Sequence, residues 1–266
     1  MSVRGRAAAC ATALLAAAGA GGLAAQVPPG TAQPERPTVA THAGTVAAGW
    51  WEVEAGVEAD GAFGSASARS YSAPLELKFG VVSHVQLTVT GSVQRPAAST
   101  LLGDITVGFK WRLLDHSRAL GRFAVLPAVT IPTGRSALGA GTGETAGSLL
   151  LISSRNLGPM EMDLNLGYTR RAGDGSRAPR QATLWTASFG GPAHGSLGWT
   201  AEVYGYPATS GPAGEASLVA LLAGPTWTVR PSLVLDTGFI VPLVGPQPRA
   251  LYAGLTQNLG RLWGPR

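Results

Sequence analysis

The chain has 266 residues, of which 45% are hydrophobic and only 13% charged, with 37 glycines and 19 prolines. Its formal net charge is +5, but the basic residues are dispersed and not interleaved with aromatic residues, which argues against nucleic-acid binding. Cys10 is the only cysteine and lies near the start of the chain, so no disulfide or thiolate metal site is expected after it. Four scattered histidines make no metal cluster, and the sequence predicts no cofactor.

The N-terminus has the features of a secretory signal peptide. Arg4 and Arg6 form a basic region, Ala7–Ala20 is a run of small apolar residues, and Leu23–Ala25 gives a cleavage site. We therefore predict a signal peptide over residues 1–25, with an uncleaved anchor helix as the alternative. No later run of about 20 apolar residues predicts a transmembrane helix.

Residues 26–48 are rich in Pro, Thr and Ala and show little pattern, so we expect a flexible N-terminal tail. From Gly49 to the C-terminus, short alternating runs are separated by Gly, Pro and Ser, which is typical of an all-β chain. About twelve strands are expected, an even number as in bacterial outer-membrane barrels. They span Gly49–Glu58, Tyr71–Gly80, His84–Ser92, Gly103–Leu114, Leu120–Ile131, Thr145–Ser154, Pro159–Thr169, Arg180–Phe189, Ser196–Tyr206, Glu215–Val229, Ser232–Val241 and Ala250–Leu262.

The run Gly103–Leu114 shows the alternation most clearly. Apolar residues occupy every second position, and the residues between them are polar, charged or glycine. The apolar side comprises Ile105, Val107, Phe109, Trp111 and Leu113. A period of two indicates a strand whose two faces meet different surroundings. We interpret the apolar side as a lipid face and the other as a lumen face.

Two runs alternate poorly. Thr145–Ser154 contains four consecutive large apolar residues, and Glu215–Val229 is apolar on both sides near its middle. Either run could face a filled part of the lumen or a protein interface. The connectors between predicted strands alternate in length. Counted along the chain, the first, third and later odd-numbered connectors are longer than the even-numbered ones, as expected for long extracellular loops and short periplasmic turns.

A soluble β-sandwich or a lipocalin-like barrel would also alternate, with its polar face outside. The low charge content argues against it, because about a quarter or more of a soluble surface is usually charged. Aromatic residues such as Trp51, Trp111 and Trp227 fall near the predicted strand ends, as in an interfacial girdle. The sequence therefore favours an antiparallel up-and-down transmembrane β-barrel over residues 49–266.

Several strings resemble one outer-membrane β-barrel family, named for a phenol meta-cleavage degradation pathway, whose members are described as transporters. They are Pro74–Gly80, Gly103–Leu114, Leu126–Gly134 and Leu164–Tyr168. The resemblance implies a bacterial outer-membrane location and a role in moving small, often hydrophobic or aromatic, organic solutes. It implies contact with outer-membrane lipid and insertion by the barrel-assembly machinery. Such barrels tend to end on an aromatic residue, whereas this chain continues past Trp263 for three residues.

The predicted lumen face carries acids and bases that strand direction places largely in the periplasmic half of the barrel. The candidate site comprises Glu52, Glu54, Glu76, Lys78, Asp104, Lys110, Arg112, Arg122, Glu161, Asp163 and Glu202. One interpretation is a salt-bridge network that braces and closes the lumen, and the other is a selectivity constriction for solutes. Both can hold together.

Enzymatic function is not expected, because no histidine falls on the extracellular rim, where lipid-acting barrels work. His42 lies in the predicted tail, and His84, His116 and His194 lie in predicted periplasmic connectors. We therefore predict a passive channel whose solute contacts the loops Pro132–Glu144 and Arg170–Pro179. The alternatives are an occluded structural or interaction barrel and a soluble periplasmic sandwich.

Overall fold

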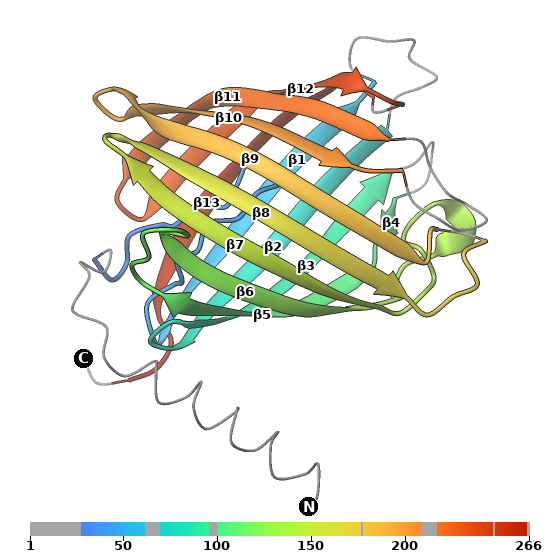
Figure 1. The fold of residues 1–266 in the computed structure, drawn as a ribbon, viewed down its shortest axis with the longest axis horizontal. Coiled ribbons are helices and arrows are strands. Elements are labelled where there is room, and N and C mark those ends of the chain that lie inside the picture. The colour runs from blue at the N-terminus through green and yellow to red at the C-terminus, as the bar shows by residue number, and fades with distance from the viewer. Residues whose placement is uncertain are drawn as a thin grey trace, which may run out of the picture.

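The computed structural model describes residues 28–61, 70–95, 100–176, 178–208, 217–246 and 248–264. The predicted signal peptide lies outside the described residues. Within them the chain forms a closed antiparallel β-barrel of twelve long strands, which confirms the predicted fold class (Figure 1). The strands are β1 (Trp50–Asp60), β2 (Ser70–Val82), β3 (Val85–Arg95), β5 (Ile105–Leu114), β6 (Arg122–Ile131), β7 (Ala146–Leu157), β8 (Met160–Arg171), β9 (Gln181–His194), β10 (Leu197–Tyr206), β11 (Leu218–Arg230), β12 (Leu233–Val244) and β13 (Ala250–Arg261).

Two short elements accompany these strands. The two-residue strand β4 (Leu101–Leu102) extends the pairing of β3 where β5 begins, and the 3₁₀ turn η2 (Ser136–Leu138) lies between β6 and β7. The barrel closes because β1 pairs with β13 along its whole length, from Trp50 opposite Arg261 to Asp60 opposite Ala250. Strands of ten to fourteen residues, tilted as in such barrels, are long enough to cross an apolar band of about 25 Å.

The two ends of the barrel differ in the length of their connectors. One end, here the turn end, carries the connectors 83–84, 115–121, 158–159, 195–196 and 231–232. The other, here the loop end, carries 61–69, 132–145, 172–180, 207–217 and 245–249, together with the segment around β4. The predicted alternation of long and short connectors is present with one exception, since 245–249 is shorter than 115–121. The exception arises because β12 extends to Val244, three residues beyond its predicted end.

The outer surface of the barrel is apolar. In β5 the side chains of Ile105, Val107 and Phe109 are 37–42% exposed. Lys110, the next residue along the strand, is fully buried on the inner side. The register shifts between Arg112 and Leu114, and this bulge makes Leu114 an outward residue in place of the predicted Leu113. Trp51 and Phe79, opposite each other on β1 and β2 near the turn end, stack with ring centroids 6.1 Å apart. Among the described residues, no helix is both long and apolar enough to span a bilayer.

Residues 28–48, here called the plug, lie inside the barrel, which corrects the expectation of a flexible tail. The plug begins and ends at the turn end, where Ala32 N–H bonds Pro231 O at 2.8 Å and Gly49 N–H bonds Gly80 O at 2.7 Å. Ala40, Ala43 and Val46 are almost completely buried. The composition of the segment suggested a tail because it has no period of its own. Its order comes from contacts with barrel side chains, and a local pattern does not report such contacts.

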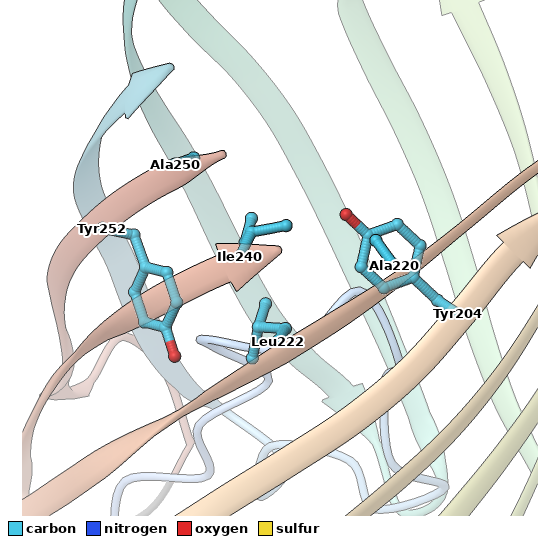
Figure 2. Packing of buried hydrophobic residues seen from close by; sticks show 6 residues of the cluster. All are labelled: Tyr204, Ala220, Leu222, Ile240, Ala250 and Tyr252. Atoms are coloured by element: carbon cyan, nitrogen blue, oxygen red, sulfur yellow. The ribbon is translucent and has the colours of Figure 1, made fainter. Parts of the chain in front are cut away.

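The plug explains the two strands that alternate poorly. Ile152 and Leu150, on the inner face of β7, pack near Ala43 of the plug. Leu222 and Ala220, on the inner face of β11, form a cluster with Tyr204, Ile240, Ala250 and Tyr252, and Val39 of the plug packs against it. Figure 2 shows these six side chains together on the inner side of β10–β13, above the pale blue plug. The inner faces of both strands are therefore apolar because the lumen beside them is filled.

Candidate functional site

The plug has little secondary structure, so its backbone N–H groups need partners from the barrel wall. Barrel carboxylates supply many of them. Glu52 accepts from Gln33 N at 2.8 Å, and Glu54 accepts from the N–H groups of Glu35 and Arg36 at 2.7 and 3.0 Å. On the opposite wall, Glu202 accepts from the N–H groups of Val39 and Ala40, both at 2.7 Å.

Neutral side chains on the wall bind the second half of the plug, residues 41–46, in the same way. Asn165 accepts from Thr41 N and donates to Thr41 O, at 2.8 and 2.9 Å. Ser154 Oγ accepts from Ala43 N at 2.7 Å, and Gln86 accepts from Val46 N at 2.9 Å. The wall therefore binds the plug backbone on several sides, through side chains from β1, β3, β7, β8 and β10.

Two buried lysines complete the network. Lys78 Nζ lies 2.5 Å from carboxylate oxygens of both Glu52 and Glu54, and it donates to Gln33 O at 2.6 Å. Lys110 Nζ pairs with Glu35 of the plug and donates to His42 O and Gly44 O, both at 3.1 Å. A buried ammonium is tolerated only when it is paired and its protons are bonded, and both lysines meet this condition.

Two ionisable groups of the plug respond to this environment. Burial alone would raise the pKa of Glu35, but Lys110 and Lys78 outweigh it and lower the pKa to about 2. Burial, reinforced by Lys110, lowers the pKa of His42 to about 3, so His42 is neutral at pH 7. His42 Nδ1 accepts from Gly44 N at 2.9 Å, a bond that requires the neutral ring.

The Arg36 side chain of the plug lies against the barrel wall where two glycines of neighbouring strands meet. Gly56 of β1 and Gly254 of β13 lie directly opposite each other, and a Cβ atom at either would overlap the Arg36 guanidinium. Asp236 of β12 lies beside this guanidinium, with Oδ1 at 3.5 Å from Arg36 Nη2. The absence of side chains at Gly56 and Gly254 therefore leaves room for the Arg36 guanidinium against the wall.

The predicted site residues separate into three groups. Glu52, Glu54, Lys78, Lys110 and Glu202 contact the plug, and Glu76 lies nearby on β2. At the turn end, Arg112 pairs with Asp115 at 2.9 Å, Arg122 pairs with Glu161, and Asp163 bonds Ser154. Asp104 stands apart at the loop end, where it accepts from Gly134 N and Thr142 N and so fixes the loop after β6.

Sequence reasoning missed the residues of the plug itself, above all Glu35, Arg36 and Val39. The one available signal was a Glu-Arg pair between prolines at 34 and 37 in a segment otherwise poor in charge. Within the described residues, no group of three or more His, Cys, Asp or Glu is arranged to hold a metal ion.

The plug separates two cavities in the lumen. The cavity on its loop-end side, here called the vestibule, has a volume of about 400 Å³ and ends on Glu35 and Thr41 of the plug. A cavity of about 390 Å³ on the turn-end side is lined by Gln33, residues 44–48 of the plug, and Arg112 and Arg122 of the wall. The Glu35–Lys110 contact lies between them.

This fold, with an apolar belt, a filled polar lumen and unequal connectors, defines an outer-membrane-type β-barrel. Residues 43–241 match the model of the family described as "Putative MetA-pathway of phenol degradation", and the chain belongs to that family. A search among curated proteins finds no sequence match.

Solved structures of the same fold include outer-membrane channels and porins. The COG4313 outer membrane channel from Pseudomonas putida F1 superposes with a TM-score of 0.62 at 12% identity, over 81% of this chain and 97% of that one. The NanC porin gives a TM-score of 0.54 at 10% identity, over 79% and 100%. The KdgM porin, in complex with disordered oligogalacturonate, gives 0.52 at 9%, over 77% and 98%. At these identities the likeness establishes the fold.

Proposed function

We propose that the protein is an outer-membrane channel for small organic solutes, closed by its plug and opened when the plug moves. The loop end faces outward and the turn end faces the periplasm, as the connector lengths favour. The observation that carries the proposal is the pair of cavities on either side of the plug. A solute would enter the vestibule from outside and pass when the plug leaves its binding groups.

The family description and the apolar part of the vestibule favour hydrophobic or aromatic solutes. Within this proposal the protein performs no catalysis. His42 is held by plug backbone, and His84 lies 3.3 Å from Asp115 at the turn end, so neither is placed beside a loop-end serine. Insertion would depend on the barrel-assembly machinery, and the outer face would contact lipid. Cleavage of a signal peptide near Ala25 remains part of the proposal.

The test is conductance in planar bilayers, with solute flux into liposomes as a second readout. We expect low conductance for the mature protein and a large increase when residues 28–46 are deleted. A peptide spanning residues 26–48, added from the turn-end side, should reduce the conductance of the deleted form, whereas a scrambled peptide should not. Absence of conductance in the folded, plug-deleted barrel would reject the channel.

The second candidate is an occluded barrel with a structural or binding role. The observation that favours it is the filling of the lumen beside β10–β13 by Tyr204, Leu222 and Tyr252, which does not depend on the plug alone. In that case the plug is a permanent part of the core. The plug-deleted barrel would then unfold or stay closed, and the two candidates are distinguished by the same experiment.

A further inference from the structure

The vestibule has two chemically different walls. Its hydroxyl wall carries Thr88 and Thr90 of β3 and Thr106 of β5. Its apolar wall carries Leu126, Leu150 and Leu184, from β6, β7 and β9. A cavity of this size with an apolar body and a few placed polar groups is typical of a small-molecule site.

Two glycines shape the apolar wall. A Cβ atom at Gly108 would lie 2.9 Å from Leu126 Cδ1, and one at Gly167 would lie 3.1 Å from Leu150 Cδ1 and 3.4 Å from Leu184 Cβ. The side chains of Leu126, Leu150 and Leu184 therefore pack over the glycines of the neighbouring strands. These leucines give one side of the vestibule an apolar surface, suited to the body of a small organic molecule.

Glu76 differs from the other acids around the plug. Lys78 and plug N–H groups satisfy Glu52 and Glu54, and Lys110 pairs with Glu35. Within the described part of the chain, Glu76 has no hydrogen-bond or ion-pair partner, although it is half-buried and lines the vestibule. It also lies directly opposite Glu54 in the β1–β2 ladder, an arrangement of like charges that costs stability unless something compensates it.

The hydroxyl wall continues from Glu76, since Thr90 of β3 is its direct cross-strand neighbour. Of the other charged groups lining the vestibule, Glu35 pairs with Lys110, and the guanidinium of Arg171 donates to Pro179 O at 2.6 Å. The vestibule thus offers a carboxylate without a partner at its inner end, hydroxyls beside it and apolar side chains opposite.

Extending the proposed channel function, on which this inference rests, we propose that the vestibule binds small amphiphiles through a hydrogen-bond-donating head group, an alcohol or an amine. Glu76 accepts the hydrogen bond from the head, and the leucines contact the apolar body. When Glu76 is ionised, a ligand with an anionic head of the same size is rejected, because the charge of the head would face the charge of Glu76 in a site of low polarity. Glu76 is then the residue that determines specificity.

The test compares three probes that share one ring and differ in the head: benzyl alcohol, benzylamine and benzoate. Binding to the purified, detergent-solubilised full-length mature protein is measured by titration calorimetry. We expect the alcohol and the amine to bind at least about tenfold more tightly than benzoate, the scale of a hydrogen bond to a charged group. Comparison of the alcohol with the amine shows which donor the site prefers.

Three variants assign the selectivity to Glu76. Glu76→Gln should weaken the amine about tenfold and narrow the gap between alcohol and benzoate, whereas Glu76→Asp, which keeps the charge, should retain the order of the wild type. Glu161→Gln, which removes a lumen carboxylate outside the vestibule, should change nothing. Equal binding of benzoate and benzylamine to the wild type would overturn the proposal, as would an unchanged order in folded Glu76→Gln.

This binding experiment is separate from conductance. Selective binding by a barrel that never conducts would retain the vestibule site and reject the channel. Conductance by a barrel without this selectivity would retain the channel and reject the role of Glu76.

Discussion

Glu202 is the acid whose removal should loosen the plug most directly. It is almost fully buried, and its two oxygens accept the N–H groups of Val39 and Ala40, both at 2.7 Å. A hydrogen bond to a charged group contributes about 1.5–3 kcal/mol, so Glu202→Ala forfeits about 3–6 kcal/mol of docking free energy. Removing the carboxylate also removes the free-energy cost of burying its charge, which offsets part of this loss. We therefore expect the docking free energy to weaken by ~3 kcal/mol.

A loss of ~3 kcal/mol corresponds to about a hundredfold increase in the population of the undocked plug, since 1.4 kcal/mol is tenfold. The assay uses Ala43→Cys as a reporter, because residue 43 is fully buried against the wall and the chain has no cysteine after Cys10. The reaction rate of this thiol with a water-soluble maleimide should rise about a hundredfold in Glu202→Ala. Glu202→Gln, which keeps one acceptor oxygen, should give a smaller rise.

Glu161→Ala is the matched control, because Glu161 pairs with Arg122 at the turn end and no hydrogen bond joins it to the plug among the described residues. The Ala43→Cys thiol should react with the maleimide at the same rate in the Glu161→Ala variant as in the protein that carries Ala43→Cys alone. Labelling of folded Glu202→Ala at the rate of the reporter alone would refute the argument that side-chain acceptors hold the plug in place.

The other predictions concern the wall, the central lysine and pH. Val107→Arg, on the outer face of β5, should cost about 2–4 kcal/mol in folding into lipid, whereas Thr106→Arg should cost less; equal losses in refolding titrations would contradict the assignment of faces. Lys110→Met leaves Glu35 buried without its partner and should lower the free energy of unfolding, measured by heat or denaturant, by about 3–5 kcal/mol. Adding Glu35→Gln should recover much of this loss. No recovery would mean that Lys110 acts mainly through its hydrogen bonds to His42 O and Gly44 O. Acid should weaken plug docking. The pKa of His42 is about 3 in place of 6.5, so the stabilisation that neutral His42 gives the docked plug is lost as pH falls from 6.5 towards 3; the pKa of Glu35 is about 2 in place of 4.5, so the stabilisation from its carboxylate is lost between pH 4.5 and 2. Conductance should therefore rise as pH falls from 7 to 4, and His42→Gln should remove the part of the rise above pH 4.5.

The barrel was predictable because alternation is a local property. Each strand sits between lipid and lumen, so the period of two survives in β5 and β8, and eleven of the twelve predicted spans begin within two residues of the observed strands. The remaining one, Glu215–Val229, begins three residues early, before Leu218. Ends shift where bulges occur, as between Arg112 and Leu114, because a single extra residue leaves no mark in composition.

The plug was not predictable, because its structure depends on partners far away in the chain. Val39 and Ala40 are held by Glu202, more than 160 residues later, and no local rule connects them. The sequence did contain an indirect sign. Ile152 and Leu222 are apolar where a water-filled lumen would be lined by polar residues, and the filled lumen explains both.

The structure brings part of the predicted charge cluster together around the plug. Glu52, Glu54, Lys78 and Lys110 do lie together, but they bind the plug backbone and not only one another. Asp104 was grouped with them because it shares the lumen side of β5 by alternation. Its position at the loop end makes it an anchor for the loop containing Gly134 and Thr142 instead.

The central claim is that passage requires movement of the plug, and a reversible cross-link tests it most directly. Ala43 N lies 2.7 Å from Ser154 Oγ, so residue 43 of the plug contacts residue 154 of the wall, and the cross-link joins Ala43→Cys to Ser154→Cys in a chain otherwise free of cysteine after Cys10. The control joins two wall strands through Thr106→Cys and Thr130→Cys, whose hydroxyl oxygens lie 2.8 Å apart. Single-channel conductance should vanish in the oxidised plug-locked variant, return on reduction, and persist in the oxidised wall-locked control. Equal conductance of the plug-locked variant before and after reduction would contradict the claim.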